Sequence, residues 1–323
     1  MRAIVSKIYG SPKHVMHMQV VEEPVPKENE VLIRVQATTV NDYDWSLARG
    51  KPYLYRLMFG LLRPKYTIFG MELSGIVEET GISAKKFVIG DEVFGDISDH
   101  GFGTFAEYVC VDENVLRHKP LALSFEEAAS IPHAALLALQ SFKIVGNLQA
   151  GQQVLINGAG GGVGVTALYL ATMQDCVVTG VDSADKLAGL RQMGYDHVID
   201  YRQQDFTKNG KTYDVILDCK TNRPPWAYLR SLKKTGTYIT VGGKLSSLLG
   251  VLFFGRLSRL FSEKGMRILA LKPNDGLEEI VNHYVGGDIK CLIDGPYTLD
   301  EVPDLVEYFG LGKHKGKIVV KVS

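Results

Sequence analysis

The sequence predicts an α/β fold in which a β-rich part begins the chain and a parallel, doubly wound sheet fills its middle. Three observations carry this prediction. The length of 323 residues favours two domains. Residues 31–39 alternate apolar side chains with others, as a half-buried strand does. From about Leu121, short apolar runs alternate with helical patterns, which is typical of parallel strands with helices on both faces of the sheet.

The first part of the chain consists of strand signals separated by turns. Val31–Thr39, VLIRVQATT, has the period of two that a strand requires. Gly75–Glu78 and Glu92–Phe94 are short apolar runs bounded by glycine and aspartate. We therefore expect a β-rich domain here.

The middle part opens with helical segments. Ser124 and Glu127 have the spacing of a capping box ahead of Phe125–Val145, and Pro132 is an expected break in that stretch. Strands and helices then alternate. We expect one helix from the glycine loop through Ala171 and another around Ala184–Met193. We expect strands at Val154–Ile156, Val177–Val181, His197–Asp200, Val215–Leu217, Tyr238–Val241 and Arg267–Leu271. The tail adds helices near Leu277–Tyr284 and Asp300–Phe309 and a strand at Ile318–Val320.

Composition excludes several classes of protein. Lys and Arg number 36 and Asp and Glu number 36, so the surplus of cations that a general nucleic-acid binder needs is missing. Four separated cysteines without a C-x-x-C pair argue against a disulfide scaffold and favour a reducing compartment. The first residues lack a secretory signal pattern. We expect a cytoplasmic protein.

The most apolar stretch is Leu245–Phe261, LSSLLGVLFFGRLSRLF. Gly250, Gly255, Arg256 and Arg259 interrupt it, and its unbroken apolar runs are far shorter than the ~20 residues of a membrane span. A buried helix or subunit contact and an apolar flap beside a substrate pocket both fit it. Attachment to a membrane is a third, less favoured interpretation, and we expect no membrane partner.

A glycine-rich loop follows the first strand of the middle part. Gln153–Gly164 reads QVLINGAGGGVG, a variant of the dinucleotide-binding fingerprint. A tight turn, the close approach of a diphosphate and helix packing all require small residues here, and the helix N-terminus then faces the phosphates. We predict nucleotide binding by Gly158, Ala159, Gly160, Gly161, Gly162, Val163 and Gly164.

The end of the second strand leaves the choice between NAD and NADP open. Asp182 stands where a carboxylate can bind the 2′-hydroxyl of the adenine ribose, which favours NAD, or it can cap the next helix. Ser183, Lys186 and Tyr201 can instead bind a 2′-phosphate, although Lys186 can equally be a solvated surface charge. NADPH is slightly preferred, with NADH as the alternative because of Asp182. Small residues Val241, Gly242 and Gly243 follow the fifth strand and let the backbone approach the cofactor.

Several stretches together resemble one family, the zinc-independent quinone-oxidoreductase branch of the medium-chain dehydrogenase/reductase superfamily, which includes zeta-crystallin. They occur in order along nearly the whole chain. They are Val40–Asp44 (VNDYD) with Arg49-Gly50, Gly70–Val77 (GMELSGIV) with Gly90–Val93, Gly103–Val109 (GTFAEYV) with Ala128–Gln140, the glycine loop, and Gly194–Tyr201 (GYDHVIDY) with Gly316–Val319.

This resemblance implies a Rossmann domain inserted in a GroES-like catalytic domain. Residues 1–121 and 273–323 would form the GroES-like domain and residues 122–272 the dinucleotide-binding domain. It also implies a homodimer that uses NADPH. Zinc-dependent relatives carry a Cys near Asn41–Asp44 and a His at the position of Met71, and this chain has neither, so we expect no metal.

The resemblance also points to residues at the reactive end. It places Asn41 beside the nicotinamide, as a cofactor-binding and catalytic residue. Tyr43 and Tyr53 are candidate donors of a hydrogen bond or proton to a substrate carbonyl, although a tyrosine at such a position is more often a packed aromatic. Asp44 is more simply interpreted as a carboxylate that anchors its own loop by backbone hydrogen bonds. The chain departs from the family pattern at Ser46, Leu137 and Lys220-Thr221.

Without a metal, hydrogen bonds must polarise the substrate carbonyl. We therefore predict an NAD(P)H-dependent enzyme that reduces quinones or α,β-unsaturated carbonyl compounds by hydride transfer. A non-zinc alcohol or aldehyde oxidoreductase is one alternative. A low-turnover NADPH-binding sensor or RNA-binding protein is another, although the balanced charge counts against nucleic acid.

Overall fold

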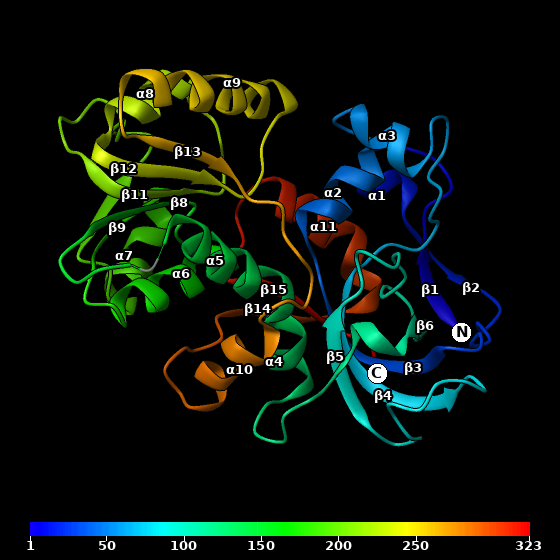
Figure 1. Ribbon diagram of the computed structural model, residues 1–323. Coiled ribbons are helices and arrows are strands. Elements are labelled where there is room, and N and C mark those ends of the chain that lie inside the picture. Colours follow the sequence, from blue (N-terminus) through cyan, green and yellow to red (C-terminus); the bar gives the residue numbers. More distant parts are fainter. Residues whose placement is uncertain (147) are drawn as a thin grey trace. The chain divides into compact units, whose positions relative to one another are not determined.

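The computed structural model describes the backbone of residues 1–146 and 148–323, with all their side chains except those at 245 and 259. The chain forms two compact units (Figure 1). Unit 1 contains residues 1–133, 273–277 and 291–323, and unit 2 contains residues 134–272 and 278–290. Both ends of the chain belong to unit 1, and most of the middle of the chain belongs to unit 2.

Unit 1 is built on a seven-stranded sheet with the order β14-β15-β3-β4-β5-β7, and β6 pairs with β3. β1 and β2 form a separate antiparallel pair. The strands are β1 (Arg2–Val5), β2 (His17–Val20), β3 (Glu30–Thr39), β4 (Glu72–Thr80), β5 (Glu92–Asp96), β6 (Tyr108–Asp112), β7 (Arg117–His118), β14 (Ile293–Thr298) and β15 (Lys317–Lys321). The helices are α1 (Pro12–Val15), α2 (Asp42–Arg49), α3 (Leu54–Phe59), α4 (Phe125–Ser130) and α11 (Val302–Gly310), with short 3₁₀ turns at Glu113–Val115 and Leu299–Glu301.

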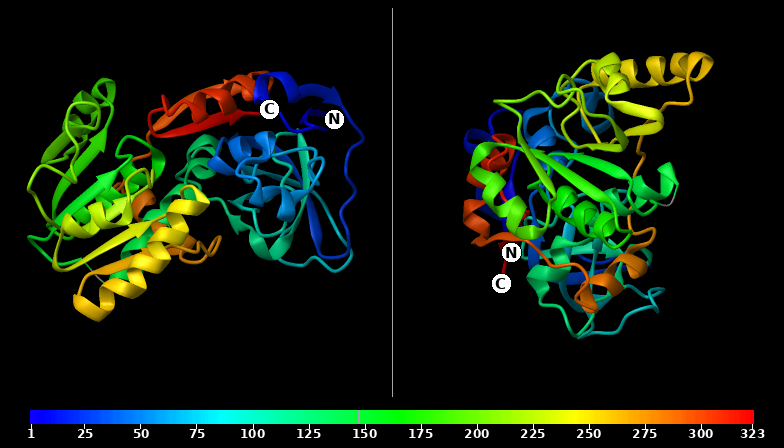
Figure 2. Two further views of the ribbon diagram at one scale, coloured as in Figure 1. Left: turned by 90° about the horizontal axis from the view of Figure 1, so that it is seen from above. Right: turned by 90° about the vertical axis from the view of Figure 1, so that its left-hand side faces the viewer.

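The two ends of the chain share the core of unit 1. β15 pairs antiparallel with β3, with Val319 opposite Thr39, so the N- and C-terminal segments run side by side (Figure 2). Val31 and Ile33 of β3 belong to the same buried apolar cluster as Ile318 and Val320 of β15. The C-terminal strand is therefore part of the sheet that holds the first domain together.

Unit 2 contains a six-stranded sheet with the order β10-β9-β8-β11-β12-β13, and every pairing in it is parallel. This confirms the predicted α/β fold. Its strands are β8 (Gln153–Asn157), β9 (Val177–Asp182), β10 (His197–Asp200), β11 (Tyr213–Asp218), β12 (Leu232–Thr240) and β13 (Gly265–Ile268). Its helices are α5 (Pro132–Val145, which begins in unit 1), α6 (Gly162–Thr172), α7 (Ala184–Met193), α8 (Pro225–Arg230), α9 (Leu245–Phe261) and α10 (Leu277–Val285).

Local signals set several helix ends. The predicted capping box is present, because Ser124 Oγ accepts the Glu127 N–H at 3.1 Å and the Glu127 carboxylate accepts the Ser124 N–H at 2.9 Å. α4 ends at Ser130 and α5 begins at Pro132, as expected from the break in that stretch. α7 ends at Met193 and is capped by Gly194, whose φ of 107° is the left-handed conformation that glycine adopts without strain.

Candidate functional site

The strand order of unit 2 reverses between β8 and β11, and the glycine loop lies at this point. In parallel α/β sheets, ligands bind where such a reversal leaves a crevice beyond the carboxyl ends of the strands. β8 ends at Asn157, the loop follows, and α6 begins at Gly162 with Gly161 as its N-cap. The first N–H groups of a helix have no carbonyl partner within it. Those of Gly162–Gly164 are thus the groups that a diphosphate would bind.

The geometry of the loop requires glycine at several of its positions. Gly158 has a φ of 94°, and a Cβ there would lie 3.1 Å from Cβ of Cys219 and 3.3 Å from Cε of Lys220. A Cβ at Gly164 would lie 2.5 Å from the Ala159 carbonyl oxygen. The loop therefore folds closely on its neighbours and is free of side chains, the kind of cradle that a dinucleotide diphosphate fits.

Asp182, at the end of β9, shapes the glycine loop. Its carboxylate accepts the N–H of Gly160 at 2.8 Å and the N–H of Ser183 at 2.8 Å. Lys186 Nζ lies 3.6 Å from the same carboxylate, and both side chains are buried. Asp182 is thus not the helix cap, a position that Ser183 occupies. Its negative charge is largely compensated by these donors.

Lys186 lies against the loop rather than in solvent. A Cβ on Gly160 would lie 2.8 Å from Cδ of Lys186, so the aliphatic part of this lysine covers the glycine. Burial lowers the pKa of Lys186, while the nearby charge of Asp182 acts to raise it. The interpretation of Lys186 as a solvated surface charge is wrong.

The other predicted cofactor residues lie at the same edge of this sheet. Tyr201 follows β10, is 42% exposed, and its N–H donates to the Asp182 carbonyl. Val241, Gly242 and Gly243 follow β12. A Cβ on Gly243 would lie 2.6 Å from Cβ of Thr221, so this position also requires glycine. The structure therefore brings the predicted residues of unit 2 together at one sheet edge.

The loop after β11 has a role that sequence reasoning missed. The buried Asp218 carboxylate accepts the side chain of Asn157, the N–H groups of Lys220 and Thr221, and the hydroxyl of Tyr238, at 2.8 to 3.0 Å. Thr221 has a left-handed φ of 44°, and its hydroxyl hydrogen-bonds Gly242 and Thr240. Side-chain hydrogen bonds thus stabilise a backbone shape that glycine would adopt without strain.

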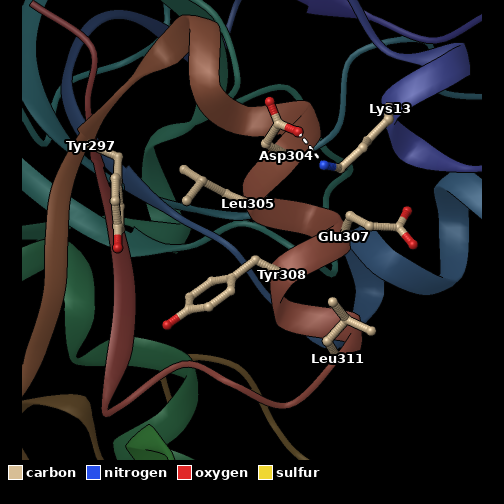
Figure 3. Close-up of a pocket in the computed structure, with 7 residues that line it drawn as sticks. All are labelled: Lys13, Tyr297, Asp304, Leu305, Glu307, Tyr308 and Leu311. Carbon is tan, nitrogen blue, oxygen red and sulfur yellow. Dashed lines mark ion pairs between the residues drawn. The ribbon is translucent and has the colours of Figure 1, made fainter.

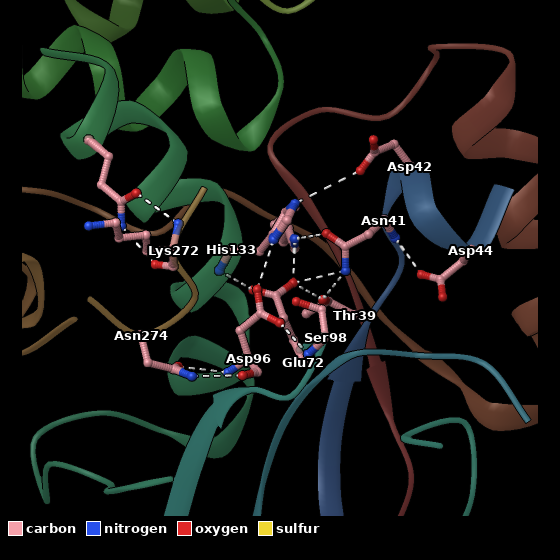
Figure 4. Close-up of polar contacts among 12 residues, drawn as sticks. Thr39, Asn41, Asp42, Asp44, Glu72, Asp96, Ser98, His133, Lys272 and Asn274 are labelled. Carbon is pink, nitrogen blue, oxygen red and sulfur yellow. Dashed lines mark hydrogen bonds and ion pairs between the residues drawn. The ribbon is translucent and has the colours of Figure 1, made fainter. Parts of the chain in front are cut away.

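Unit 1 contains a buried network of charged side chains around Glu72 on β4 (Figure 4). The Glu72 carboxylate accepts hydrogen bonds from Thr39 Oγ1, from Asn41 Nδ2 at 3.0 Å and from the His133 N–H at 2.6 Å. Lys317 Nζ lies 2.5 Å from it and also donates to Asn41 Oδ1. Four separate segments of the chain meet at this carboxylate.

His133 is paired with a second buried acid, Asp96 on β5. The ring Nδ1 lies 2.8 Å from the Asp96 carboxylate. Burial lowers the pKa of His133, but the hydrogen bond and charge of Asp96 outweigh it, so the net pKa is raised. For Asp96, burial acts to raise the pKa, and the hydrogen bonds and charge of His133 together with Ser98 bring it below its usual range. Asn274 holds the backbone of Asp96 by two further hydrogen bonds.

Asn41 is buried and has a fixed orientation. Its Nδ2 donates to Glu72 and, at 3.2 Å, to Thr39, while Oδ1 accepts from Lys317. An amide has two donors and two lone pairs, so only the second lone pair of Oδ1 remains. Asp44 accepts the N–H groups of Asn41 and Gly70 at 2.8 and 2.9 Å, which confirms it as a structural carboxylate. Burial raises the pKa of Asp44 to about 7.

The two candidate tyrosines lie in different surroundings. The Tyr43 ring packs near His133, with 6.1 Å between ring centroids, and beside Tyr55 and Phe102. Burial, followed by the charges of nearby aspartates, raises the pKa of Tyr43 to about 12. Tyr53 is 67% exposed and its ring stacks on the Arg56 guanidinium. The structure thus brings Asn41 and Tyr43 to the polar network of unit 1 and leaves Tyr53 on the surface.

Sequence reasoning missed most of this network. From the sequence, no role could be assigned to Glu72, Asp96, His133 or Lys317. The available signal was the presence of charged residues inside apolar strand segments, GMELSGIV and GKIV. In the parts of the chain that the structure describes, no group of three or more His, Cys, Asp or Glu side chains is arranged to hold a metal ion.

A hollow beside α11 in unit 1 contains none of the predicted residues. Two of its charged groups pair with each other, since Lys13 Nζ lies 2.6 Å from the Asp304 carboxylate, and Glu307 accepts a hydrogen bond from Ser11. It is lined by Lys13, Tyr297, Asp304, Leu305, Glu307, Tyr308 and Leu311 (Figure 3).

Known proteins resemble this chain over almost its whole length. Residues 27–121 match the family described as alcohol dehydrogenase GroES-like domain, and residues 193–320 match that described as zinc-binding dehydrogenase. A mitochondrial NAD(P)H oxidoreductase of Bos taurus is 31% identical, over 91% of this chain and 82% of its own. A 2-methylene-furan-3-one reductase of Solanum lycopersicum is 29% identical, over 97% and 76%. The quinone oxidoreductase structure from Coxiella burnetii has a TM-score of 0.89 and 26% identity, covering 100% of this chain and 99% of that one.

Proposed function

The chain belongs to the quinone-oxidoreductase-like branch of the medium-chain dehydrogenase/reductase superfamily, and on that premise we propose that it is an NAD(P)H-dependent reductase of quinones and α,β-unsaturated carbonyl compounds. The observation that carries the proposal is the glycine loop at the strand-order reversal of unit 2, where a side-chain-free backbone precedes a glycine-capped helix. The names of the relatives support the substrate classes, a quinone in one case and an enone in another.

The residues present fit a dinucleotide. Gly158–Gly164 would bind the diphosphate of the cofactor through backbone N–H groups. The small residues Val241–Gly243 would let the protein backbone come close to the cofactor. Ser183, Lys186 and Tyr201 would bind the adenosine end. When bound, a reduced nicotinamide supplies a hydride to the electron-poor carbon of the acceptor.

We favour NADPH over NADH. An NAD-binding carboxylate must be available to accept the ribose hydroxyls. The Asp182 carboxylate already accepts two N–H groups and lies beside Lys186, so it is less available and less repulsive toward a phosphate. Lys186 is the cation that would attract a 2′-phosphate.

Reduction in this chain is proposed to be independent of zinc. Met71 is fully buried at the position where zinc-dependent relatives carry histidine, and a thioether is a poor ligand for zinc. The segment Asn41–Ser46 contains no cysteine. Hydrogen bonds from the protein would then polarise the acceptor carbonyl.

Among the candidate groups, Tyr43 is best suited to donate that hydrogen bond. Its ring lies beside the buried network, with 6.1 Å between the centroids of Tyr43 and His133, whereas Tyr53 is 67% exposed. Asn41 has both amide protons engaged by Glu72 and Thr39, so its proposed role is to present a fixed Oδ1 to the nicotinamide side. The ionic network of Glu72 and Lys317 holds it in that orientation.

We further propose a homodimer in the cytoplasm. The edge strand β13 has one partner in the sheet, β12, which leaves its other edge available for pairing. All four cysteines are free thiols, as a reducing compartment favours. Light scattering of the purified chain tests the dimer.

The test of the function is a set of oxidation assays with NADPH and NADH. Panels of 1,4-quinones and enones should be reduced, whereas saturated aldehydes of matched length should not. Reduction of the aldehydes alone would favour a carbonyl reductase. Tight NADPH binding by calorimetry with no turnover of any acceptor would overturn the reductase and favour a sensor.

A further inference from the structure

Helix α9 exposes large apolar side chains along the face that it turns away from its sheet. Their spacing of three and four residues places them on one side of the helix, and they are between 39% and 83% exposed. The opposite side is packed, since Val251 is buried and a Cβ on Gly255 would lie 3.1 Å from Met266 of β13. The exposed stripe consists of Leu249, Leu252, Phe253, Leu257, Leu260 and Phe261.

An exposed tryptophan lies beside this helix. Trp226 of α8 is 54% exposed, and its ring centroid is 5.9 Å from that of Phe254 in α9. Tryptophan favours the boundary between water and an apolar phase, because its ring is apolar and its N–H is polar. We call α9's stripe together with Trp226 the α9 patch (α8 and α9 are labelled in Figure 1).

Unit 1 carries a second exposed apolar segment around α3. Described side chains here are between 42% and 88% exposed, and α3 has no buried residue at all. Soluble proteins rarely leave so many large apolar side chains exposed in so short a segment unless a partner covers them. This α3 patch consists of Tyr53, Leu54, Leu57, Met58, Leu61 and Leu62.

Both patches are positively charged, although the chain as a whole is neutral. Residues 51–65 contain four basic residues and no acidic one, namely Lys51, Arg56, Arg63 and Lys65. Residues 244–267 contain one acidic residue, Glu263, against five basic ones, Lys244, Arg256, Arg259, Lys264 and Arg267. Arg256 is exposed within the apolar stripe itself. Two segments from different units thus share one unusual combination of features.

We propose that the α3 patch and the α9 patch can each bind the surface of an anionic lipid bilayer. Apolar side chains would enter the interface while lysine and arginine lie among the lipid headgroups. No helix in the described part of the chain is long and apolar enough to cross a membrane, so the proposal concerns surface binding. It departs from the sequence expectation of no membrane partner, which was based on the lack of a spanning segment.

The charge of the patches argues against a second copy of the chain as the occupant. In a symmetric dimer formed through this surface, each patch would face either the same patch or the other patch of the partner, and both are positive. Two surfaces of the same positive charge repel each other, and such a contact is costly when water is excluded. An anionic surface has the complementary charge.

Sedimentation of the full chain with vesicles tests the proposal. We expect binding to vesicles of phosphatidylcholine mixed with phosphatidylglycerol, much weaker binding to phosphatidylcholine alone, and weakening by salt. The double variant Phe253→Ser/Leu260→Ser and the variant Arg256→Glu should each weaken binding about tenfold or more. These side chains are exposed, so the variants should keep the wild-type melting temperature.

Matched controls change the same chemistry elsewhere. Ile82 and Leu121 are 89% and 95% exposed, so Ile82→Ser/Leu121→Ser removes apolar surface outside both patches, and Lys208→Glu reverses an exposed charge outside them. These variants should bind vesicles as the wild type does. Equal losses in controls and patch variants would overturn the proposal. The proposal would also be overturned if the chain did not sediment with any anionic vesicle. In that case, light scattering can show whether the patch variants instead dissociate an oligomer or a complex with an acidic protein.

Discussion

Nζ of Lys317 lies 2.5 Å from the carboxylate of Glu72, and both side chains are nearly inaccessible to solvent. The pair joins the C-terminal strand β15 to β4 across β3, which lies between them in the sheet. Asn41 hydrogen-bonds both side chains and Thr39 hydrogen-bonds Glu72, so the pair also fixes Asn41, which is proposed to serve the cofactor. A structural ion pair and the candidate active site are therefore parts of one network.

Breaking this pair should destabilise the protein strongly. In Lys317→Met, the Glu72 carboxylate stays buried without its cation, a change that typically costs about 3–5 kcal/mol. Urea denaturation measures it. Lys13→Met breaks an exposed pair with Asp304 and should cost less than about 1 kcal/mol. The double variant Lys317→Met/Glu72→Gln removes both charges and should recover part of the loss. An equal cost for Lys13→Met and Lys317→Met would contradict this account.

The pairing of His133 with Asp96 should make stability depend on pH. Because the pKa of His133 is raised in the folded protein, this residue contributes to the free energy of unfolding. The contribution is complete below the unfolded pKa of about 6.5 and is lost as the pH rises through the folded pKa. Because the pKa of Asp96 is lowered, its contribution is present above about 3.9 and is lost as the pH falls through the folded value.

The difference in unfolding free energy between the wild type and His133→Gln should therefore be largest between about pH 4 and pH 6.5. Urea denaturation of both proteins over a pH series gives this difference, in which the other titrating groups largely cancel. A difference that does not change with pH would show that the pair is not ionic.

The sequence predicted features that depend on near neighbours in the chain. The glycine loop could be located because a strand, three spaced glycines and a helix follow one another, and Asp44 could be assigned because its partners include the backbone three residues before it. The apolar pattern predicts the last strand of unit 2 at Arg267–Leu271, and the strand occurs as β13 at Gly265–Ile268. Its register is set by pairing with Thr237–Thr240 of β12, which local apolar pattern does not encode.

The buried network could not be predicted in the same way. Glu72, Asp96, His133 and Lys317 come from four distant segments, and only the pairing of β15, β3, β4 and β5 brings these segments together. A charged residue in an apolar strand segment signals that a partner exists but does not identify it. Likewise, the apolar stretch Leu245–Phe261 fits a buried helix, a subunit contact or a flap, and its pattern does not show that α9 buries one side and exposes the other, which excludes only the fully buried helix.

Lys186 should discriminate between the two cofactors. In Lys186→Ala, the cation that attracts a 2′-phosphate is lost and the charge of Asp182 is less compensated. We expect NADPH binding to weaken about 10- to 100-fold, which corresponds to the loss of one charged hydrogen bond, while NADH binding changes little. Calorimetric titration with both cofactors measures this, and Lys208→Ala, an exposed lysine of the same unit, is the control. Equal weakening of both cofactors would remove Lys186 from the phosphate site.

The two candidate tyrosines can be separated by removing each hydroxyl. Tyr43→Phe keeps the ring among Tyr55, Phe102 and His133 but removes the donor, so kcat with quinones or enones should fall about 100-fold while NADPH binding is retained. Tyr53 is exposed, and Tyr53→Phe should change kcat less than twofold, which is about 0.4 kcal/mol. Since burial raises the pKa of Tyr43 to about 12, its ionisation should not appear in the pH–rate profile below about pH 10. Steady-state kinetics of both variants measure these changes in kcat. A larger loss of kcat in Tyr53→Phe than in Tyr43→Phe would assign the donor role to Tyr53 and require α3 to move toward the substrate.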